Sequence, residues 1–250
     1  PYNEKTHKLN YRISEMFSAI RACNYYPIIR LFFCIIACIY NMSKIKNLIF
    51  DIGNVIVDID YMTTVAEFQK LSTVDFSAIV SYSRQHHIFD QFETGKVTAQ
   101  QFRDELKRFL KTAVSDEEIN HAWNSILIDY PVQKIDLLRH LKTRYPVFAL
   151  SNINEIHVAS IDRVACEKFG AHSFREFFHA AYYSNEVGLR KPDREIYENV
   201  LAKENLNATE TFFVDDKEEN VETARQLGFQ AYQLTHPDKL TELLTQLQII

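Results

Sequence analysis

Three apolar runs along the chain each end in polar side chains that can take part in chemistry. Carboxylates offer ligands for a metal ion or a nucleophilic oxygen, and a hydroxyl and an amide offer hydrogen bonds to a substrate. The residues are Asp51 after "LIF", Ser151 and Asn152 after "VFAL", and Asp215 and Asp216 after "TFFV". Their types favour a site that combines a metal ion with a carboxylate.

The chemistry that fits this set is phosphoryl transfer. Asp51 and Asp216 would repel each other at one rim unless a cation lies between them, and Mg²⁺ prefers carboxylate and phosphate oxygens. Lys191, in "GLRKPD", can neutralise Asp51 and a phosphate oxygen together. Ser151 and the amide after it can bind further phosphate oxygens. A carboxylate nucleophile, a metal, a lysine and hydrogen-bond donors are what transfer through an aspartyl-phosphate requires.

The elements that must position these residues alternate along the chain. Strands are predicted at 48–50, 146–152, 179–184, 211–216 and 230–235, and helices at 132–145, 193–205, 218–227 and 237–248. Strands that alternate with helices of this length predict an α/β fold with a doubly wound, parallel, Rossmann-like sheet. In such sheets the active groups gather at the carboxyl ends of the strands. The polar residues are therefore expected to meet at one edge.

The strand pattern is absent for about eighty residues after Asp60, and helical signals replace it. Thr98 with Gln101, and Ser115 with Glu118, form capping boxes ahead of apolar stripes at helical spacing. Trp123 belongs to one stripe and is predicted to be a core residue. We expect a small helical cap at 62–134, inserted into an α/β core formed by 42–61 and 135–250.

Composition excludes several other functions. None of the five glycines are two residues apart, so neither a G-x-G-x-x-G dinucleotide loop nor a Walker loop can form. The net charge is −5 and there is no run of Lys and Arg, which argues against nucleic acid as a partner. The four cysteines show no disulfide or zinc-finger spacing. We expect a cytoplasmic protein, a monomer or homodimer, that acts on a small phosphorylated metabolite.

The first 41 residues do not fit this fold. Residues 31–40, "LFFCIIACIY", are apolar but too few to span a bilayer. Their length would also suit a signal peptide, although no small-residue cleavage site follows. Met42 directly precedes the first strand. We interpret 1–41 as an extension outside the catalytic fold; an export or membrane role is the alternative.

Four motifs together carry a resemblance to a known family. "FDIGNVIVDID", "LSN", "GLRKPDREIY" and "FFVDDKEENVETARQLG" resemble the motifs of the haloacid-dehalogenase superfamily of hydrolases, in the subgroup with a small helical cap. The "D-x-GNV" form and "FETGKVT" are similar to bacterial α-glucose-1-phosphate phosphatases. The resemblance covers about residues 46–235.

The resemblance implies roles for individual residues. Asp51 matches the nucleophile, Ser151 the phosphate-binding hydroxyl and Lys191 the motif lysine. Mg²⁺ would be bound by Asp51, the backbone carbonyl of Gly53, Asp216, and Asp215 as a ligand or as its neighbour. Asn152 would add a donor near the substrate. Asn220 stands where many relatives carry another acid.

Gly53 departs from the family pattern, which has Asp at this position as general acid and base. Losing that group typically lowers a rate by about 10²–10⁴-fold. One reading is a phosphatase for substrates with good leaving groups, such as sugar 1-phosphates, with Asp58 or Asp60 as substitute proton donors. A second is an inactive relative that binds phosphorylated ligands. A third, less favoured, is a metal-independent 2-haloacid dehalogenase.

The loop "FETGKVT" in the cap is where we expect substrate specificity. A cap that closes over the site excludes water and selects the substrate. Lys96 and Glu93 are predicted to contact the sugar of a sugar phosphate.

Overall fold

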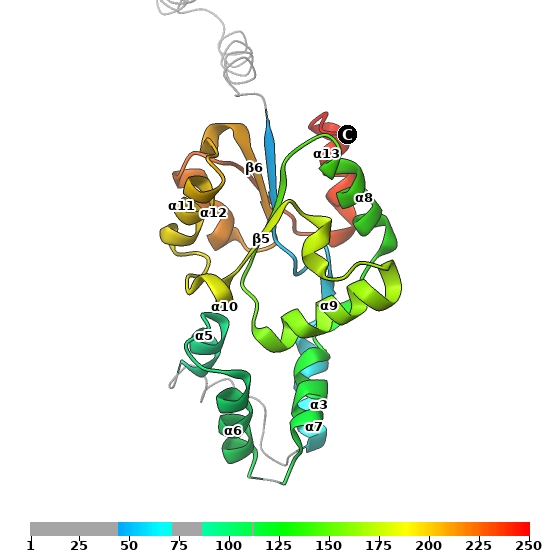
Figure 1. Cartoon of the computed structure of the whole chain (residues 1–250), viewed down its shortest axis with the longest axis vertical. Coiled ribbons are helices and arrows are strands. Elements are labelled where there is room, and N and C mark those ends of the chain that lie inside the picture. The colour runs from blue at the N-terminus through cyan, green and yellow to red at the C-terminus, as the bar shows by residue number, and fades with distance from the viewer. Residues whose placement is uncertain (1–44, 72–86, 112) are drawn as a thin grey trace, which may run out of the picture. The chain divides into compact units, whose positions relative to one another are not determined.

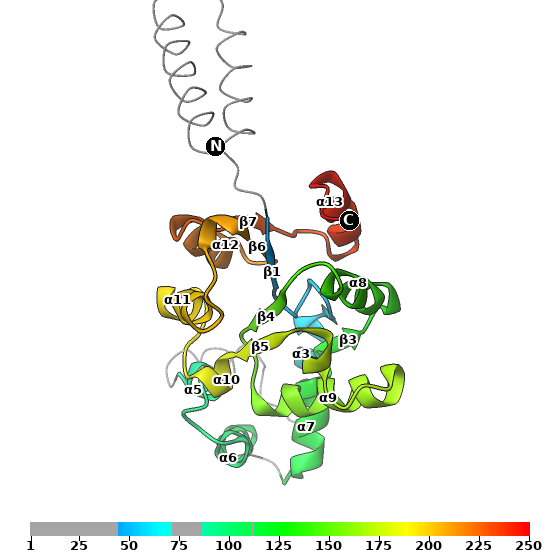
Figure 2. The ribbon, with the colours of Figure 1, turned by 45° about the horizontal axis from the view of Figure 1, so that its top comes forward.

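The computed structural model describes residues 45–71, 87–111 and 113–250. Its centre is a five-stranded sheet in the order β5-β4-β1-β6-β7, in which every neighbouring pair is parallel (Figures 1 and 2). This confirms the predicted doubly wound α/β fold. The strands are β1 (Asn47–Phe50), β4 (Val147–Ser151), β5 (Ala180–Tyr183), β6 (Thr211–Asp215) and β7 (Gln230–Gln233).

Helices cover both faces of the sheet because its inner strands are apolar on both sides. Ile49 packs with α11 and α12 on one face, whereas Leu48 and Phe50 belong to the apolar cluster under α8, α9 and α13 on the other. The two helix groups lie on opposite sides of the strands in Figure 1. The helices are α8 (Val132–Lys142), α9 (Glu155–Phe169), α11 (Arg194–Lys203), α12 (Glu218–Gln226) and α13 (Leu240–Gln246).

Short helical segments complete the connections between strands. They are α10 (Ser184–Val187) and the 3-10 helices η1 (Phe174–Phe177), η2 (Ala208–Glu210) and η3 (Pro237–Lys239).

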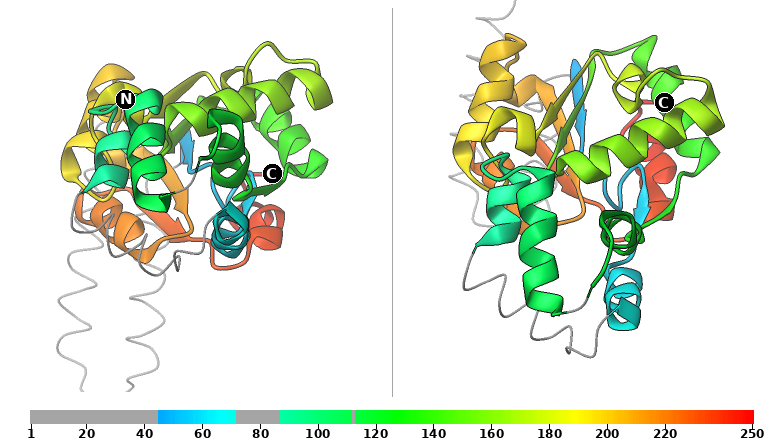
Figure 3. Two further views of the ribbon diagram at one scale, coloured as in Figure 1. Left: turned by 90° about the horizontal axis from the view of Figure 1, so that it is seen from below. Right: turned by 60° about the horizontal axis from the view of Figure 1, so that its bottom comes forward.

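The helical cap lies beyond the carboxyl ends of the strands (Figures 1 and 3). Both predicted capping boxes are present, with Thr98 and Ser115 each accepting from the backbone N–H three residues on. The cap has its own apolar cluster, which includes Phe68, Phe92 and Phe102. Its helices within the described ranges are α3 (Tyr61–Leu71), α5 (Ile88–Glu93), α6 (Ala99–Leu110) and α7 (Asp116–Asn124).

One expectation for the cap region was wrong. The sequence shows no strand pattern there, yet β3 (Leu127–Asp129) pairs antiparallel with β2 (Asp58–Ile59). β2 directly precedes the first cap helix and β3 directly follows the last one, so their pairing joins the two connections between the core and the cap. Strands of two and three residues are too short for alternation to be visible, and the pairing exists only because the two connections meet in space.

Two sequence predictions lie outside the described residues. The extension at 1–41 is one, and residues 72–86 and 112 of the predicted cap at 62–134 are the other. Within the described part of the chain, no helix combines the length and the apolar character that crossing a membrane requires.

Candidate active site

Asp51 is the first residue after β1 and lies in the crevice that the strand order predicts. Its side chain is buried, and its Oδ1 accepts a hydrogen bond from the backbone N–H of Ile52 at 2.7 Å and forms an ion pair with Lys191 Nζ at 3.0 Å. Within the described residues, no hydrogen bond reaches Oδ2. One oxygen is therefore held in place while the other is available to react.

Lys191 is almost fully buried, with 1% of its surface exposed. Besides Asp51, its Nζ donates to Asp215 Oδ2 at 2.6 Å. The backbone of Lys191 is fixed by the amide of Asn152: the Lys191 N–H donates to Asn152 Oδ1 and the Asn152 Nδ2 donates to the Lys191 carbonyl, each at 2.8 Å. Asn152 thus positions the lysine, and both ends of its amide are engaged in doing so.

The two adjacent acids at the end of β6 have different surroundings. Asp215 is fully buried, and its Oδ1 accepts from the Lys217 N–H and from Asn220 Nδ2, both at 2.9 Å, while Oδ2 binds Lys191. Asp216 is more exposed, and its Oδ2 accepts from Asn54 Nδ2 at 3.1 Å. Asp215 is saturated with donors, so Asp216 is the better placed of the two to offer an oxygen to a metal ion.

The donor set fits a divalent cation. Asp51, Asp215 and Asp216 place one oxygen each within 4.8 Å of one another, and Lys191 pairs with two of these three carboxylates. Burial raises the pKa of Asp51 to about 6 despite the opposing effect of Lys191. Burial also raises the pKa of Asp216, with Asn54 acting in the other direction. A Mg²⁺ ion would relieve this crowding of negative charge, because oxygen ligands are those it prefers.

Gly53 leaves space that a neighbouring side chain occupies. A Cβ built on Gly53 would lie 3.0 Å from Cδ1 of Ile59, the end of a flexible side chain. An acid at this position would therefore need Ile59 to move. Neither proposed substitute donor lines the cavity beside Gly53: Asp58 binds Lys134 Nζ at 2.7 Å and Asp60 accepts from the Met62 N–H at 2.8 Å.

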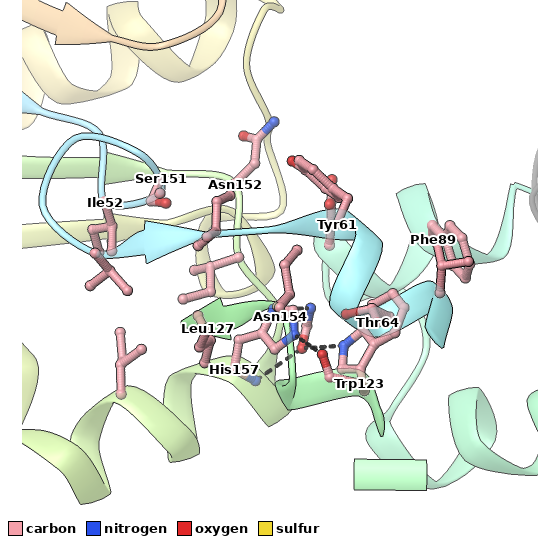
Figure 4. A pocket seen from close by; sticks show the side chains of 18 residues that line it. Ile52, Tyr61, Thr64, Phe89, Trp123, Leu127, Ser151, Asn152, Asn154 and His157 are labelled. Atoms are coloured by element: carbon pink, nitrogen blue, oxygen red, sulfur yellow. Dashed lines mark hydrogen bonds between the residues drawn. The ribbon is translucent and has the colours of Figure 1, made fainter. Parts of the chain in front are cut away.

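A cavity of about 430 Å³ adjoins these residues between the core and the cap (Figure 4). Ser151, the buried last residue of β4, lines it together with Gly53 and Asn152. The predicted specificity residues differ: Glu93 lines the cavity and pairs with Arg190 Nη2 at 3.1 Å, whereas Lys96 is exposed and is not part of the lining.

The glycine of "FETGKVT" has a packing role. Gly95 has φ of 67°, and a Cβ there would collide with the backbone carbonyl of Asn185 in α10. Glycine is needed both for the left-handed conformation and for the close approach of cap and core. The motif therefore places the cap loop against the core.

Sequence reasoning missed residues that support the site. Asn54 holds Asp216, and Arg190 joins the core to Asp90 and Glu93 of the cap. Their only sequence signal is adjacency, to Gly53 and to Lys191 respectively. Trp123, predicted as core, packs against Phe89 and Phe102 but also lines the cavity.

Comparison with known proteins agrees with this geometry. Residues 45–228 match the family model of haloacid dehalogenase-like hydrolases. D-ribitol-5-phosphate phosphatase of Bacteroides thetaiotaomicron is 32% identical over 76% of this chain and 91% of its own length. Sesquiterpene phosphatase AstK of Aspergillus oryzae is 27% identical over 83% of this chain and 98% of its own.

A solved structure is similar as well. A haloacid-dehalogenase family enzyme of Bacteroides thetaiotaomicron, crystallised with magnesium and inorganic phosphate, has a TM-score of 0.68 at 35% identity, covering 76% of this chain and 93% of that one. The fold and the site define a hydrolase with an aspartate at the end of the first strand. The chain belongs to the haloacid dehalogenase-like hydrolase family. The narrower similarity to α-glucose-1-phosphate phosphatases stays a prediction.

Proposed function

We propose that this protein is a Mg²⁺-dependent phosphatase that hydrolyses a small phosphate monoester through an aspartyl-phosphate on Asp51. The observation that carries the proposal is the meeting of Asp51, Lys191 and the acids of β6 at one crevice. The relatives named above are phosphatases of a polyol phosphate and of a sesquiterpene. They share the phosphoryl group and differ in the alcohol.

In the proposed reaction the nucleophile is Oδ2 of Asp51, because Oδ1 is held by Ile52 and Lys191. Oδ2 attacks phosphorus, an O–P bond forms, and the bond from phosphorus to the leaving oxygen breaks with its electron pair going to the alcohol. Water then attacks the same phosphorus, the bond between phosphorus and Asp51 Oδ2 breaks with its electron pair returning to the carboxylate, and the proton of the water passes to the released phosphate or to solvent. Lys191 holds Oδ1 and keeps the nucleophile oriented during both steps.

The remaining groups bind phosphate or neutralise charge. Ser151 would donate its hydroxyl to a phosphate oxygen, and Lys191 would face the same group. Asp51, Asp216 and the carbonyl of Gly53 would hold Mg²⁺, with Asp215 beside them anchoring Lys191. The ion, when bound, stabilises the negative charge that develops on the transferred oxygens.

Because Gly53 provides no proton, the leaving oxygen must depart as an anion or take its proton from water. This favours esters of acidic hydroxyls, and a sugar 1-phosphate is one candidate from the sequence. The alternative is that this protein is an inactive member of the family that binds phosphorylated ligands without hydrolysing them, and the absence of an acid at Gly53 fits that alternative as well.

Phosphate release with and without Mg²⁺ tests the proposal. We expect release from phenyl phosphate with Mg²⁺, loss of release in EDTA, and loss in Asp51→Asn. Acid-quenched enzyme should carry one phosphoryl group on the peptide that contains Asp51. Tight binding of phosphate esters without any release would instead support the inactive relative. Chloride release from a 2-haloacid in EDTA would support the metal-independent dehalogenase hypothesis instead.

A further inference from the structure

The cavity beside the candidate active site has a mostly apolar wall. It begins at Ile52, Gly53 and Ser151, which flank Asp51, and continues into the space between β2, β3, α3, α7 and α9 (Figure 4). Its volume of about 430 Å³ is within the range of small-molecule sites. The wall is formed by aliphatic side chains of both the core and the cap: Val57, Ile59, Val65, Ile126, Leu127 and Ile161.

Aromatic rings from the cap and from α9 add to the wall. Trp123 lies 5.3 Å from Phe89 between ring centroids, and it stacks on His157 at 5.4 Å with an angle of 10° between the rings. All three line the cavity. A ring or a branched hydrocarbon would find contacts here that an open surface does not offer.

The polar groups in the far part of the cavity bind one another. Asn154 Oδ1 accepts from Trp123 Nε1 at 3.3 Å and from the His157 N–H at 3.1 Å, and its Nδ2 lies 3.0 Å from His157 Nδ1. His157 Nε2 is 3.1 Å from the Trp123 carbonyl. Thr64 Oγ1 accepts from the Ser125 hydroxyl at 3.4 Å. These groups stabilise the wall and have partners already.

A polyol or sugar would therefore be poorly matched to the far part of this cavity, beyond Tyr61, Glu93 and Asn152. Each hydroxyl that enters loses its hydrogen bonds to water, and a buried polar group without a partner is destabilising. Charge is scarce too: burial lowers the pKa of His157 to about 4, so its ring is neutral at physiological pH. Among the lining residues, Glu93 is the carboxylate, and it pairs with Arg190.

The mouth of the cavity adds a second requirement. Gly53 lies between Asp51 and this wall, and the methyl end of Ile59 stands where an acid would lie. A leaving group that needs protonation is thus not assisted at this position. A phenol has a pKa near 10, as the tyrosine side chain does, so it can leave as an anion much more readily than an alkyl alcohol.

We propose that the substrate is a phosphate monoester of an apolar alcohol with an acidic hydroxyl, an aryl phosphate, whose hydrocarbon body lies in this cavity. This inference rests on the proposed phosphatase function and specifies its leaving group. During transfer to Asp51 the phenolate leaves with the electron pair of the P–O bond and then takes a proton from water.

A series of aryl phosphates tests the inference while the acidity of the phenol stays nearly constant. Phenyl phosphate is compared with its 4-methyl, 4-ethyl and 4-propyl derivatives, and with glucose 1-phosphate as a polar substrate. We expect kcat/KM to rise about fourfold for each methylene that the cavity buries, until it is filled. Glucose 1-phosphate should fall at least about 100-fold below the best aryl ester, as expected when several buried hydroxyls lack partners.

Two substitutions in one helix locate the binding of the hydrocarbon. Val65→Phe narrows the cavity, whereas Ala66→Phe adds the same ring at the exposed neighbouring position. Val65→Phe should move the best substrate to a smaller ring, and Ala66→Phe should keep the wild-type order. If Val65→Phe keeps the wild-type order too, the hydrocarbon does not bind in the cavity.

The outcomes separate the two proposals. Release from phenyl phosphate that depends on Asp51 but does not change with alkyl length would overturn the apolar leaving group and leave the phosphatase intact. A preference for glucose 1-phosphate would do the same. No release from any ester would overturn the phosphatase itself.

Discussion

The two ends of the site are built in opposite ways. At the phosphate end, Lys191 pairs with Asp51 at 3.0 Å and with Asp215 at 2.6 Å, and Asp216 places an oxygen within 4.8 Å of both acids. At the other end, aliphatic side chains and a self-contained network of Asn154, His157 and Trp123 line a cavity. Charged groups fix the reaction because few residue types can perform it. Apolar surface selects the leaving group by shape, which many residue combinations can provide.

Removing the nucleophile should have the largest effect and should not depend on the substrate. We expect Asp51→Asn to lower kcat by about 10⁴-fold or more for every phosphate ester, because the amide cannot attack phosphorus. The control is Asp136→Asn, at an exposed position on α8, which should keep wild-type kinetics. Measured turnover of Asp51→Asn within tenfold of wild type would exclude the aspartyl-phosphate route.

Substituting the two adjacent acids at the end of β6 should have different effects, mainly on stability for Asp215 and mainly on Mg²⁺ binding for Asp216. Asp215→Asn leaves the buried Lys191 without its shortest ion pair, and breaking such a pair typically lowers the free energy of unfolding by about 3–5 kcal/mol. Asp216→Asn should lower the melting temperature less and weaken Mg²⁺ binding by about tenfold or more.

Thermal melting and Mg²⁺ titration of both variants measure this difference. Equal melting temperatures, or a larger loss of Mg²⁺ affinity in Asp215→Asn, would reverse the assigned roles.

Placing an acid at position 53 tests whether the absence of a general acid restricts the protein to substrates with acidic leaving groups. The double variant Gly53→Asp with Ile59→Ala removes the contact that crowds a side chain at position 53. We expect it to raise kcat for alkyl phosphates by about 10–100-fold, because a general acid helps poor leaving groups most. Gly53→Asn with Ile59→Ala has the same shape without the proton and is the matched control. A gain in that control as large as with Asp would show that the effect is not proton donation.

The smallest predicted effect is a decrease in stability at low pH that is caused by His157, the neutral histidine of the cavity. The pKa of His157 is lowered to about 4 by burial, while in the unfolded chain it is near 6.5. The unfolded state therefore binds more protons between these values, so the stabilising effect is fully present above pH 6.5 and is lost as the pH falls toward 4. Because the residue as a whole is half-buried, we expect the free energy of unfolding to fall by about 2 kcal/mol over this pH range.

Chemical denaturation at several pH values measures this loss. His157→Gln should flatten the decline between pH 6.5 and pH 4, and His121→Gln, at an exposed position on α7, should leave it unchanged. A decline of the same slope in His157→Gln would mean that other groups cause it.

Much of the fold was predictable because its signals are local. Thr98 and Ser115 cap helices through residues three positions away, and apolar runs such as "TFFV" end where the parallel strands end. The carboxyl-end rule then brings Asp51, Ser151 and Asp215 together without knowledge of the register. The pairing of β2 with β3 was not predictable, because neither strand is long enough to show a pattern and each exists only through the other.

The sequence by itself determined the residues of the proposed chemistry: Asp51 as the proposed nucleophile, Lys191, the acids proposed for a cation, and glycine at position 53. Residue type and strand end predict that these groups meet, since their edge of the sheet follows from topology, and the resemblance of the four motifs to the family supplies the individual roles. Tertiary structure alone decided that Asn152 positions Lys191, that Asp215 is saturated while Asp216 is not, and that Trp123 and His157 line an apolar cavity. Those properties depend on contacts between residues far apart in the chain, which no local pattern records.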